Sequence, residues 1–150
     1  EIDELTKEQA SLPLHESFND RDHITECINY ACGMYENVDR DIVDSIIYYE
    51  SNYNSTAVNG ECLGLMQISK RWHSDRAEKF GITDFFDPYS NILLGVDYLS
   101  ELSNKYKDQK LVLMLYSMKH DDAFNMYRAG KVRDYAIKVL ERAEDLKKGD

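Results

Sequence analysis

Proline, glycine and cysteine are scarce in this sequence. Its 150 residues include 2 Pro, 7 Gly and 3 Cys, and no Gly/Ser-rich or Pro-rich stretch interrupts the chain as a flexible linker would. No internal repeat is visible either. The chain is long enough to bury one sizeable core. We therefore expect one domain over residues 21–150, preceded at residues 1–20 by an acidic arm or short docking helix.

Three further absences bear on the partners and the targeting of the chain. Clustered Lys and Arg are missing from a chain of net charge -10, which disfavours nucleic acid because phosphate contacts need basic clusters. The longest apolar run, residues 111–116, is far shorter than the roughly 20 residues of a transmembrane helix. No initiator Met or signal peptide precedes Glu1. We therefore expect a processed protein or an excised fragment, whose targeting segment is absent from this chain.

The three cysteines raise two questions, whether two of them form a disulfide and whether they bind a metal. Cys27, Cys32 and Cys62 leave at least one thiol unpaired in a monomer. Together with His23, Cys27 and Cys32 offer three zinc ligands, but no regular ligand pattern or clear fourth ligand accompanies them. We therefore expect buried thiols or a single disulfide, with neither a metal nor another cofactor.

Apolar residues recur at three- and four-residue spacing through most of the chain, which indicates helices. We expect Asp39 and Ser90 to cap two of them. A polar stretch rich in Asn, Ser, Thr and Gly predicts a loop or small irregular hairpin at about 52–63, followed by an apolar turn at 63–68. Strand signals are few, so the predicted fold is mainly α, a compact helical globule. The expected helices span residues 22–32, 40–51, 71–80, 90–106, 111–118, 121–129 and 132–146, of which 111–118 is expected to be the most buried.

Glu50 is the first candidate for a functional residue. It follows Ile46 by four residues and Ile47 by three, which places its carboxyl group on the apolar stripe of its helix. Burial disfavours the charged carboxylate and can raise the pKa of a glutamate from about 4.3 towards about 6. Such a group can donate a proton near neutral pH. The alternative is a solvent-facing side chain, or one paired with Arg71 or Arg76.

A series of motifs follows Glu50 in order. They are Glu50-Ser51, "NSTAVNG", "GLMQIS" from Gly64 to Ser69, "FDPYSNILLGVDYL" at 86–99, "LYS" at 115–117 and "YAIKVL" at 135–140. Together they resemble the catalytic domain of the soluble lytic transglycosylases and the related goose-type lysozymes over roughly residues 36–142. The Gly-Leu-Met-Gln motif alone would be weak. Glu-Ser about a dozen residues before it, with the later helices in register, makes the resemblance specific.

The resemblance implies a lysozyme-like fold that acts on the glycan strands of peptidoglycan. Glu50 would protonate the β-1,4 bond between N-acetylmuramic acid and N-acetylglucosamine, and then act as a base on the muramic 6-hydroxyl, which closes a 1,6-anhydro ring. Because the nucleophile belongs to the substrate, a second carboxylate is not required. We expect such an enzyme, from a bacterium, its phage or a mobile element, to act outside the cytoplasm, secreted or at the cell wall.

The resemblance also implies a set of substrate-binding residues. Gly64 would let the backbone approach a sugar, and Gln67 would bind the sugar or its acetamido group. Tyr116 and Tyr135 match family tyrosines near the acid, where a phenol orients the carboxyl and its ring excludes water. Four residues complete the set, although Ser51 is also suited to cap its helix, and Leu65 and Met66 to fill the core: Ser51, Asn59, Leu65 and Met66.

Departures from the family pattern keep other functions open. Asn59 stands where many transglycosylases have a serine, and Ser117 replaces the usual asparagine after the tyrosine, so one alternative is a glycan-binding module without turnover. Ser69 stands where goose-type lysozymes commonly have a water-activating aspartate, which favours the transglycosylase. Glu61 is still available as the base of a hydrolase. A third alternative is an all-helical interaction protein without a cleft.

Trp72 and His73 come directly after the Gly-Leu-Met-Gln segment. An aromatic beside a sugar cleft suggests stacking, yet the single Trp of a small domain is more often a core anchor, so we expect Trp72 in the core. We expect His73 at the surface or at a helix cap. The net charge of -10 argues against electrostatic adhesion to an anionic wall, so we expect a partner domain or anchor to position the enzyme.

Overall fold

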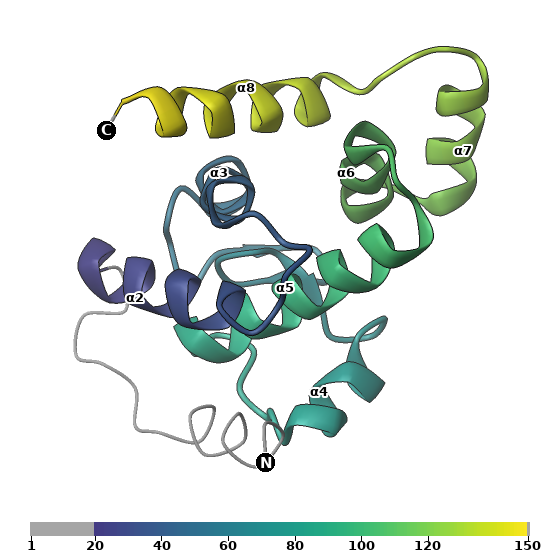
Figure 1. Ribbon diagram of the computed structural model, residues 1–150. Coiled ribbons are helices and arrows are strands. Elements are labelled where there is room, and N and C mark those ends of the chain that lie inside the picture. Colours follow the sequence, from purple (N-terminus) through teal and green to yellow (C-terminus); the bar gives the residue numbers. More distant parts are fainter. Residues whose placement is uncertain (1–19, 150) are drawn as a thin grey trace.

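The computed structural model describes residues 20–149, which form seven helices and a small sheet (Figure 1). The mainly helical prediction is confirmed, and the fold is of the lysozyme-like kind. The predicted arm lies almost entirely in residues 1–19, outside the described range. The elements are α2 (Arg21–Cys32), α3 (Arg40–Ser51), β1 (Val58–Asn59), β2 (Cys62–Leu63), β3 (Ile68–Ser69), α4 (Ser74–Phe80), α5 (Pro88–Lys105), α6 (Gln109–Ser117), α7 (His120–Arg128) and α8 (Asp134–Lys148).

Helix α5 runs through the centre of the fold (Figure 1). Every residue from Pro88 to Asp97 is buried, and α2, α6 and β3 all pack against this helix. Helix α6, which the sequence predicted to be the most buried, has a buried run only from Leu111 to Leu115. That prediction is wrong, because α5 is the more buried helix. The sequence did not indicate this, since the buried face of α5 contains polar residues such as Asn91, whose hydrogen bonds permit their burial. Those residues lower the apparent hydrophobicity of α5.

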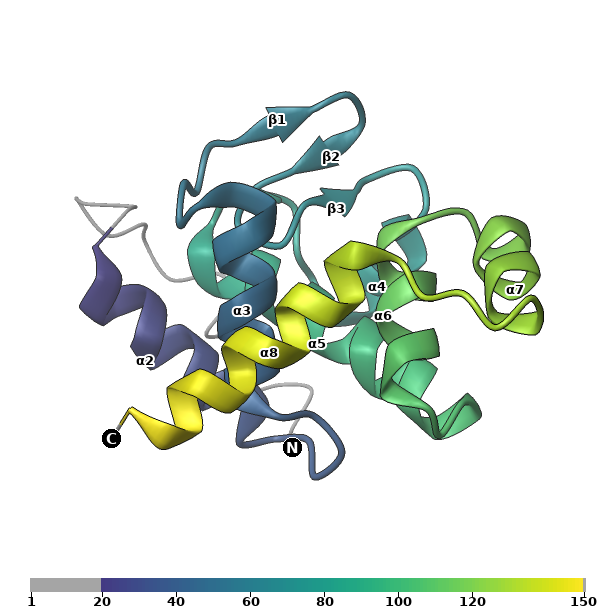
Figure 2. The ribbon, with the colours of Figure 1, turned by 90° about the horizontal axis from the view of Figure 1, so that it is seen from above.

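Helix α3 is held between the core and α8, which crosses it in Figure 2. Arg142 of α8 makes three contacts here, donating to Asp44 Oδ1 at 3.2 Å, to Ser45 Oγ at 3.1 Å and to the Tyr53 hydroxyl at 2.8 Å. These bonds fix the position of α8 along α3. The apolar stripe predicted for α3 includes three fully buried side chains, Val43, Ile46 and Ile47.

One of the two predicted N-caps is correct. Asp39 caps α3 by accepting from a backbone N–H of the first turn at 2.8 Å. Helix α5 is capped by Asp87, whose Oδ2 accepts from the backbone N–H of Ser90 at 3.0 Å. The predicted cap at Ser90 is therefore wrong. Pro88 takes the first helical position, where its missing N–H has no cost.

The predicted irregular hairpin belongs to a three-stranded antiparallel sheet of order β1-β2-β3. Val58 pairs with Leu63 across the first turn, and Cys62 pairs with Ser69 across the second. The apolar turn expected at 63–68 therefore continues into a strand. Strands of two residues show no alternating pattern, so the sequence could not indicate β3. In Figure 2 the sheet lies beside one end of α3.

The three cysteines, all within residues 20–149, form no disulfide with one another. Cys27, Cys32 and Cys62 are free thiols, so the buried-thiol alternative describes Cys27, while the other two are half-buried. The Cys27 Sγ contacts His23 Nε2 at 3.7 Å, and no group of three His, Cys, Asp or Glu side chains within residues 20–149 could hold a metal ion. Within the same residues, no helix has the length and apolar character that crossing a membrane requires.

Candidate active site

Glu50 lies in the last turn of α3, just before Asn52 ends the helix in a left-handed conformation with φ 49°. Its side chain is half-buried, and the hydroxyl of Tyr135 donates to Glu50 Oε2 at 3.1 Å. Burial raises the pKa of Glu50, and this effect outweighs the hydrogen bond from Tyr135 and the nearby charge of Arg133, which both lower it. The carboxyl group is therefore placed to keep its proton at a higher pH than an exposed glutamate does.

The alternative of an ion-paired Glu50 does not describe this structure. Arg71 pairs with Glu61 at 3.7 Å. Arg76 pairs with Asp97 and, at 2.9 Å, with Glu101. Both cations that the sequence offered as partners for Glu50 are therefore engaged elsewhere.

Tyr135 comes from the first turn of α8 and reaches Glu50 because α8 packs on α3. Burial raises the pKa of the Tyr135 phenol, and the adjacent negative charge of Glu50 raises it further. The phenol therefore stays protonated and remains a hydrogen-bond donor. This donor fixes the orientation of the Glu50 carboxyl group.

Tyr116 supports the site from α6 through a different bond. Its hydroxyl donates to the backbone carbonyl oxygen of Met66 at 2.8 Å. Burial raises the pKa of Tyr116 well above its ordinary value, and the next largest cause is the charge of Glu50. Tyr116 thus lies close enough to Glu50 to interact with its charge, while its hydrogen bond holds the Gly-Leu-Met-Gln turn.

Asn91, a residue that the sequence reasoning missed, holds the same turn from α5. Its Oδ1 accepts from the Met66 backbone N–H at 2.7 Å, and its Nδ2 donates to the carbonyl oxygens of Leu63 at 2.8 Å and Phe85 at 2.7 Å. Gly64 has φ +76°, and a Cβ there would lie 2.4 Å from Asn91 Nδ2. The glycine is therefore required by Asn91, independently of any sugar. The available indication of this role in the sequence was the polar Asn91 within the segment "SNILLG".

Leu65 and Met66 belong to the core, the alternative that the sequence left open. Both side chains are fully buried. Met66 packs on Gly95 of α5, where a Cβ would lie 2.4 Å from Met66 Sδ. Neither side chain offers surface to a ligand, so their contribution to the site is to anchor the turn.

Among three polar candidates, Ser51 ties the turn to α3, and Gln67 and Asn59 join the turn to the sheet. The Ser51 hydroxyl, at the end of α3, donates to the carbonyl oxygen of Leu65 at 2.8 Å. Gln67 donates through Nε2 to the Gly64 carbonyl oxygen at 2.9 Å and accepts through Oε1 from Asn59 at 2.9 Å. Ser51 and Gln67 are half-buried, whereas Asn59 is exposed. These contacts place the three residues around Glu50's end of α3, and their binding of substrate stays a prediction.

Arg133 is a second residue that the sequence reasoning missed. It precedes α8, and its Nη1 donates to the carbonyl oxygen of Ser117 at 2.8 Å, which joins the start of α8 to the end of α6. Its guanidinium carbon lies 5.5 Å from the centre of the Tyr135 ring. The only indication of this role in the sequence was that Arg133 lies two residues before Tyr135. Arg133 supplies a positive charge close to Glu50.

Trp72 is not a core anchor, so that prediction is wrong. The side chain is 73% exposed, because residues 70–73 form a loop between β3 and the start of α4 at Ser74 rather than the predicted first turn of a helix. His73 directly precedes α4 but makes no side-chain capping bond. It is half-buried, and burial lowers its pKa to about 4.

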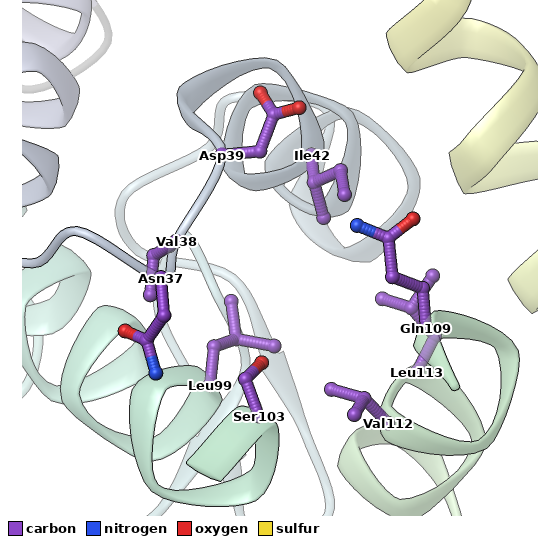
Figure 3. A pocket seen from close by; sticks show the side chains of 9 residues that line it. All are labelled: Asn37, Val38, Asp39, Ile42, Leu99, Ser103, Gln109, Val112 and Leu113. Atoms are coloured by element: carbon purple, nitrogen blue, oxygen red, sulfur yellow. The ribbon is translucent and has the colours of Figure 1, made fainter. Parts of the chain in front are cut away.

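A separate hollow lies near the opposite end of α3, between α3, α5 and α6 (Figure 3). Asp39 and Ile42, at the start of α3, contribute to it, whereas Glu50 lies in the last turn of this helix. The hollow is therefore not part of the candidate active site. Its lining residues are Asn37, Val38, Asp39, Ile42, Leu99, Ser103, Gln109, Val112 and Leu113.

A helical fold with a small sheet, and a half-buried acid at a helix end next to that sheet, define a lysozyme-like protein. The sequence profile of the Transglycosylase SLT domain family matches residues 26–132. The chain therefore belongs to this family.

Two relatives were found by sequence comparison. A transglycosylase of Enterobacteria phage PRD1 is 29% identical over 117 residues, which are 77% of this chain and 41% of that protein. Membrane-bound lytic murein transglycosylase F of Desulfosudis oleivorans is 35% identical over 71 residues, which are 47% of this chain and 15% of that protein. The chain thus covers less than half the length of either relative.

Proposed function

We propose that this protein is a peptidoglycan lytic transglycosylase that uses Glu50 as its single acid and base. Membership of the Transglycosylase SLT domain family supports this proposal. The observation that carries it is the half-buried Glu50 carboxyl, with its raised pKa and its hydrogen bond from Tyr135, at the end of α3. Such an acid is suited to protonate a glycosidic oxygen near neutral pH.

In the proposed reaction Glu50 gives one proton to the leaving group and receives another from the substrate's own hydroxyl. Glu50 protonates the oxygen that links muramic C1 to the leaving N-acetylglucosamine, and the C1–O bond breaks. The muramic 6-hydroxyl oxygen then bonds to C1, and Glu50 takes the hydroxyl proton. The product is a 1,6-anhydro ring, and no water is consumed. Between the two steps, the Tyr135 hydroxyl and the charge of Arg133 favour the carboxylate form of Glu50.

The hydrolase alternative requires a second group to activate water, and the two candidates are poorly suited to that task. Ser69, in the position where goose-type lysozymes commonly have an aspartate, carries a hydroxyl that accepts from the Trp72 backbone N–H at 3.4 Å. Glu61 lies in the β1–β2 turn with a side chain that is 59% exposed and paired with Arg71. These observations favour the substrate's own hydroxyl as the nucleophile.

We also propose that the enzyme acts outside the cytoplasm, where peptidoglycan lies, and that a partner domain or anchor positions it there. The family and the murein transglycosylase relative support the wall as the site of action. The net charge of -10 supports a separate positioning element, because an acidic domain gains little electrostatic attraction to an anionic wall.

The test is a digest of purified peptidoglycan with the wild type and with Glu50→Gln, followed by mass analysis of the released muropeptides. We expect 1,6-anhydro ends from the wild type only, with the rate of the variant lower by at least about a hundredfold. Reducing ends from the wild type would assign a hydrolase instead. Intact wall from both proteins would assign a glycan-binding module.

A further inference from the structure

Trp72 is the single Trp of the sequence and has the largest exposed fraction, 73%, among the exposed large hydrophobic side chains of residues 20–149. A lone exposed hydrophobic residue is ordinary on a protein surface and needs no explanation by itself. The backbone on which this ring stands is nevertheless fixed. The Trp72 N–H donates to Ser69 Oγ at 3.4 Å, and the His73 N–H donates to the Ser69 carbonyl oxygen at 3.0 Å. The ring therefore projects from a fixed turn at the end of β3.

A basic side chain also limits the orientation of the ring. The Arg71 guanidinium carbon lies 5.3 Å from the centre of the Trp72 ring, within the range of a cation–π contact. Arg71 is in turn paired with Glu61 of the β1–β2 turn at 3.7 Å. Exposed pairs of this kind add little stability. These two contacts nevertheless connect the Trp72 ring to the sheet, which lies beside the end of α3 that carries Glu50.

A row of aromatic rings connects the Trp72 loop to the candidate active site. The ring of His73 lies 4.6 Å from that of Tyr98, and Tyr98 lies 5.5 Å from Tyr116, between ring centres. Tyr116 holds the Gly-Leu-Met-Gln turn through the Met66 carbonyl oxygen and interacts with the charge of Glu50. The packed row therefore begins at His73, the residue next to Trp72 in the chain, and its inner end at Tyr116 interacts with the charge of Glu50.

From this arrangement we propose that the exposed ring of Trp72 is a stacking platform for one sugar ring of the glycan strand, beyond the two sugars joined by the cleaved bond. An N-acetyl hexose has an apolar face of C–H groups and a polar rim of hydroxyls. That face suits a flat indole ring, while the rim stays in water. The inference rests on the proposed glycan substrate, and it adds a binding position outside the reacting centre.

The position of this Trp makes a direct test available, because all tryptophan fluorescence of the chain comes from Trp72. The probe is a preparation of soluble glycan strands freed of their stem peptides, titrated into Glu50→Gln so that no strand is cleaved. We expect a saturable shift of the emission to shorter wavelength as a sugar covers the ring. An emission spectrum that is unchanged while the strands bind, as measured by calorimetry, would overturn the platform.

Calorimetry with substituted rings, again in the Glu50→Gln background, provides the comparison. We expect Trp72→Leu to weaken strand binding by about tenfold and Trp72→Tyr, which keeps a flat ring, by no more than about threefold. Tyr30→Leu is the matched control, because Tyr30 is also exposed, at 39%, and lies on α2, away from the sheet (Figure 2). Equal affinity of the Leu and Tyr variants of Trp72 would contradict stacking.

Turnover separates this inference from the proposed function. In an otherwise wild-type protein, we expect Trp72→Leu to raise KM for the soluble strands by about tenfold and to leave kcat unchanged, because the ring binds substrate and transition state equally. If the wild type releases no anhydro product but its fluorescence still saturates, the proposed activity fails and the platform stands. If KM is unchanged by Trp72→Leu while anhydro product forms, the platform fails and the activity stands.

Discussion

At the scale of single residues, Glu50 is subject to opposing influences. Burial raises the pKa of its carboxyl, whereas the Tyr135 hydroxyl and the Arg133 charge lower it. An acid that must first give up one proton and then accept another requires both its protonated and its carboxylate form to be accessible. Desolvation favours the protonated form before bond cleavage, and the two neighbours favour the carboxylate form after it. The balance among the three determines the pH range of activity.

Removal of the Tyr135 hydroxyl should shift that balance towards the protonated form. In Tyr135→Phe the hydrogen bond that favours the carboxylate is lost, so we expect the pKa of Glu50 to rise. The fall of kcat/KM on the alkaline side, where the acid loses its proton, should then move to higher pH, and kcat should decrease by roughly tenfold because the carboxyl is less well oriented. The measurement is a pH–rate profile on soluble glycan strands.

The matched control for this change is Tyr127→Phe. It removes a comparable hydroxyl, which donates to Asp108 Oδ2 at 2.8 Å between α7 and the start of α6. Its profile should match that of the wild type. If Tyr135→Phe also matched the wild type, Tyr135 would have no part in setting the pKa of Glu50.

The charge of the side chain at position 133 should affect the same pH–rate profile. Arg133→Met removes a positive charge that lowers the pKa of Glu50, so the alkaline limb should move to higher pH. Arg133→Lys keeps the charge, and its limb should stay close to that of the wild type. An equal shift in both variants would show that the bond to the Ser117 carbonyl oxygen matters rather than the charge.

Two residues that the sequence singled out, Glu50 and Tyr135, lie in contact in the structure. Helical periodicity placed Glu50 on the buried stripe of α3, and the family resemblance pointed to Tyr135, which contacts it. Asn91 and Arg133 were missed because their roles depend on contacts with Met66 and Ser117, 25 and 16 residues away along the chain. Such contacts become visible only when the helices are assembled.

At the scale of elements, the Gly-Leu-Met-Gln turn depends on a single close approach to α5. Gly64→Ala would place a Cβ 2.4 Å from Asn91 Nδ2 and 2.9 Å from the Phe85 carbonyl oxygen, at φ +76°. We expect a loss of about 2–4 kcal/mol in the free energy of unfolding, from backbone strain together with overpacking. Because the turn lies beside Glu50, activity should fall as well. Chemical denaturation and the peptidoglycan digest measure the two effects.

Gly60→Ala is the control for backbone strain alone. Gly60 has φ +61°, but a Cβ there would meet nothing within 4 Å. We expect a cost of about 1 kcal/mol and normal activity. Equal losses of stability from the two substitutions would mean that the contact with Asn91 is not what requires Gly64.

The helices were easier to predict than their ends and their relative burial. Periodic apolar residues indicated α2 and α3 nearly to the residue, because each buries one continuous stripe. The start of α5 was misplaced because Asp87 and Ser90 are both good caps and only the folded backbone distinguishes them. Trp72 was misplaced for a related reason, because its expected helix begins only at Ser74.

At the scale of the whole molecule, the acidic net charge should keep electrostatic attraction from contributing to wall binding. With a net charge of -10, attraction to an anionic polymer is weak, so contact with the glycan depends on the site rather than on charge. Increasing salt from about 20 mM to about 300 mM should barely reduce binding of Glu50→Gln to purified walls in a sedimentation assay. Loss of binding over that range would mean that charge governs the contact.

The most direct test of the account is the titration of the Glu50 carboxyl itself, followed by NMR with ¹³C-labelled glutamate and assigned by comparison with Glu50→Gln. A raised pKa means that the proton persists to higher pH than in an exposed glutamate. We predict a midpoint clearly above the ordinary value of 4.5 and a further rise in Tyr135→Phe. A midpoint at or below 4.5 would contradict the claim that burial keeps this acid protonated for proton transfer.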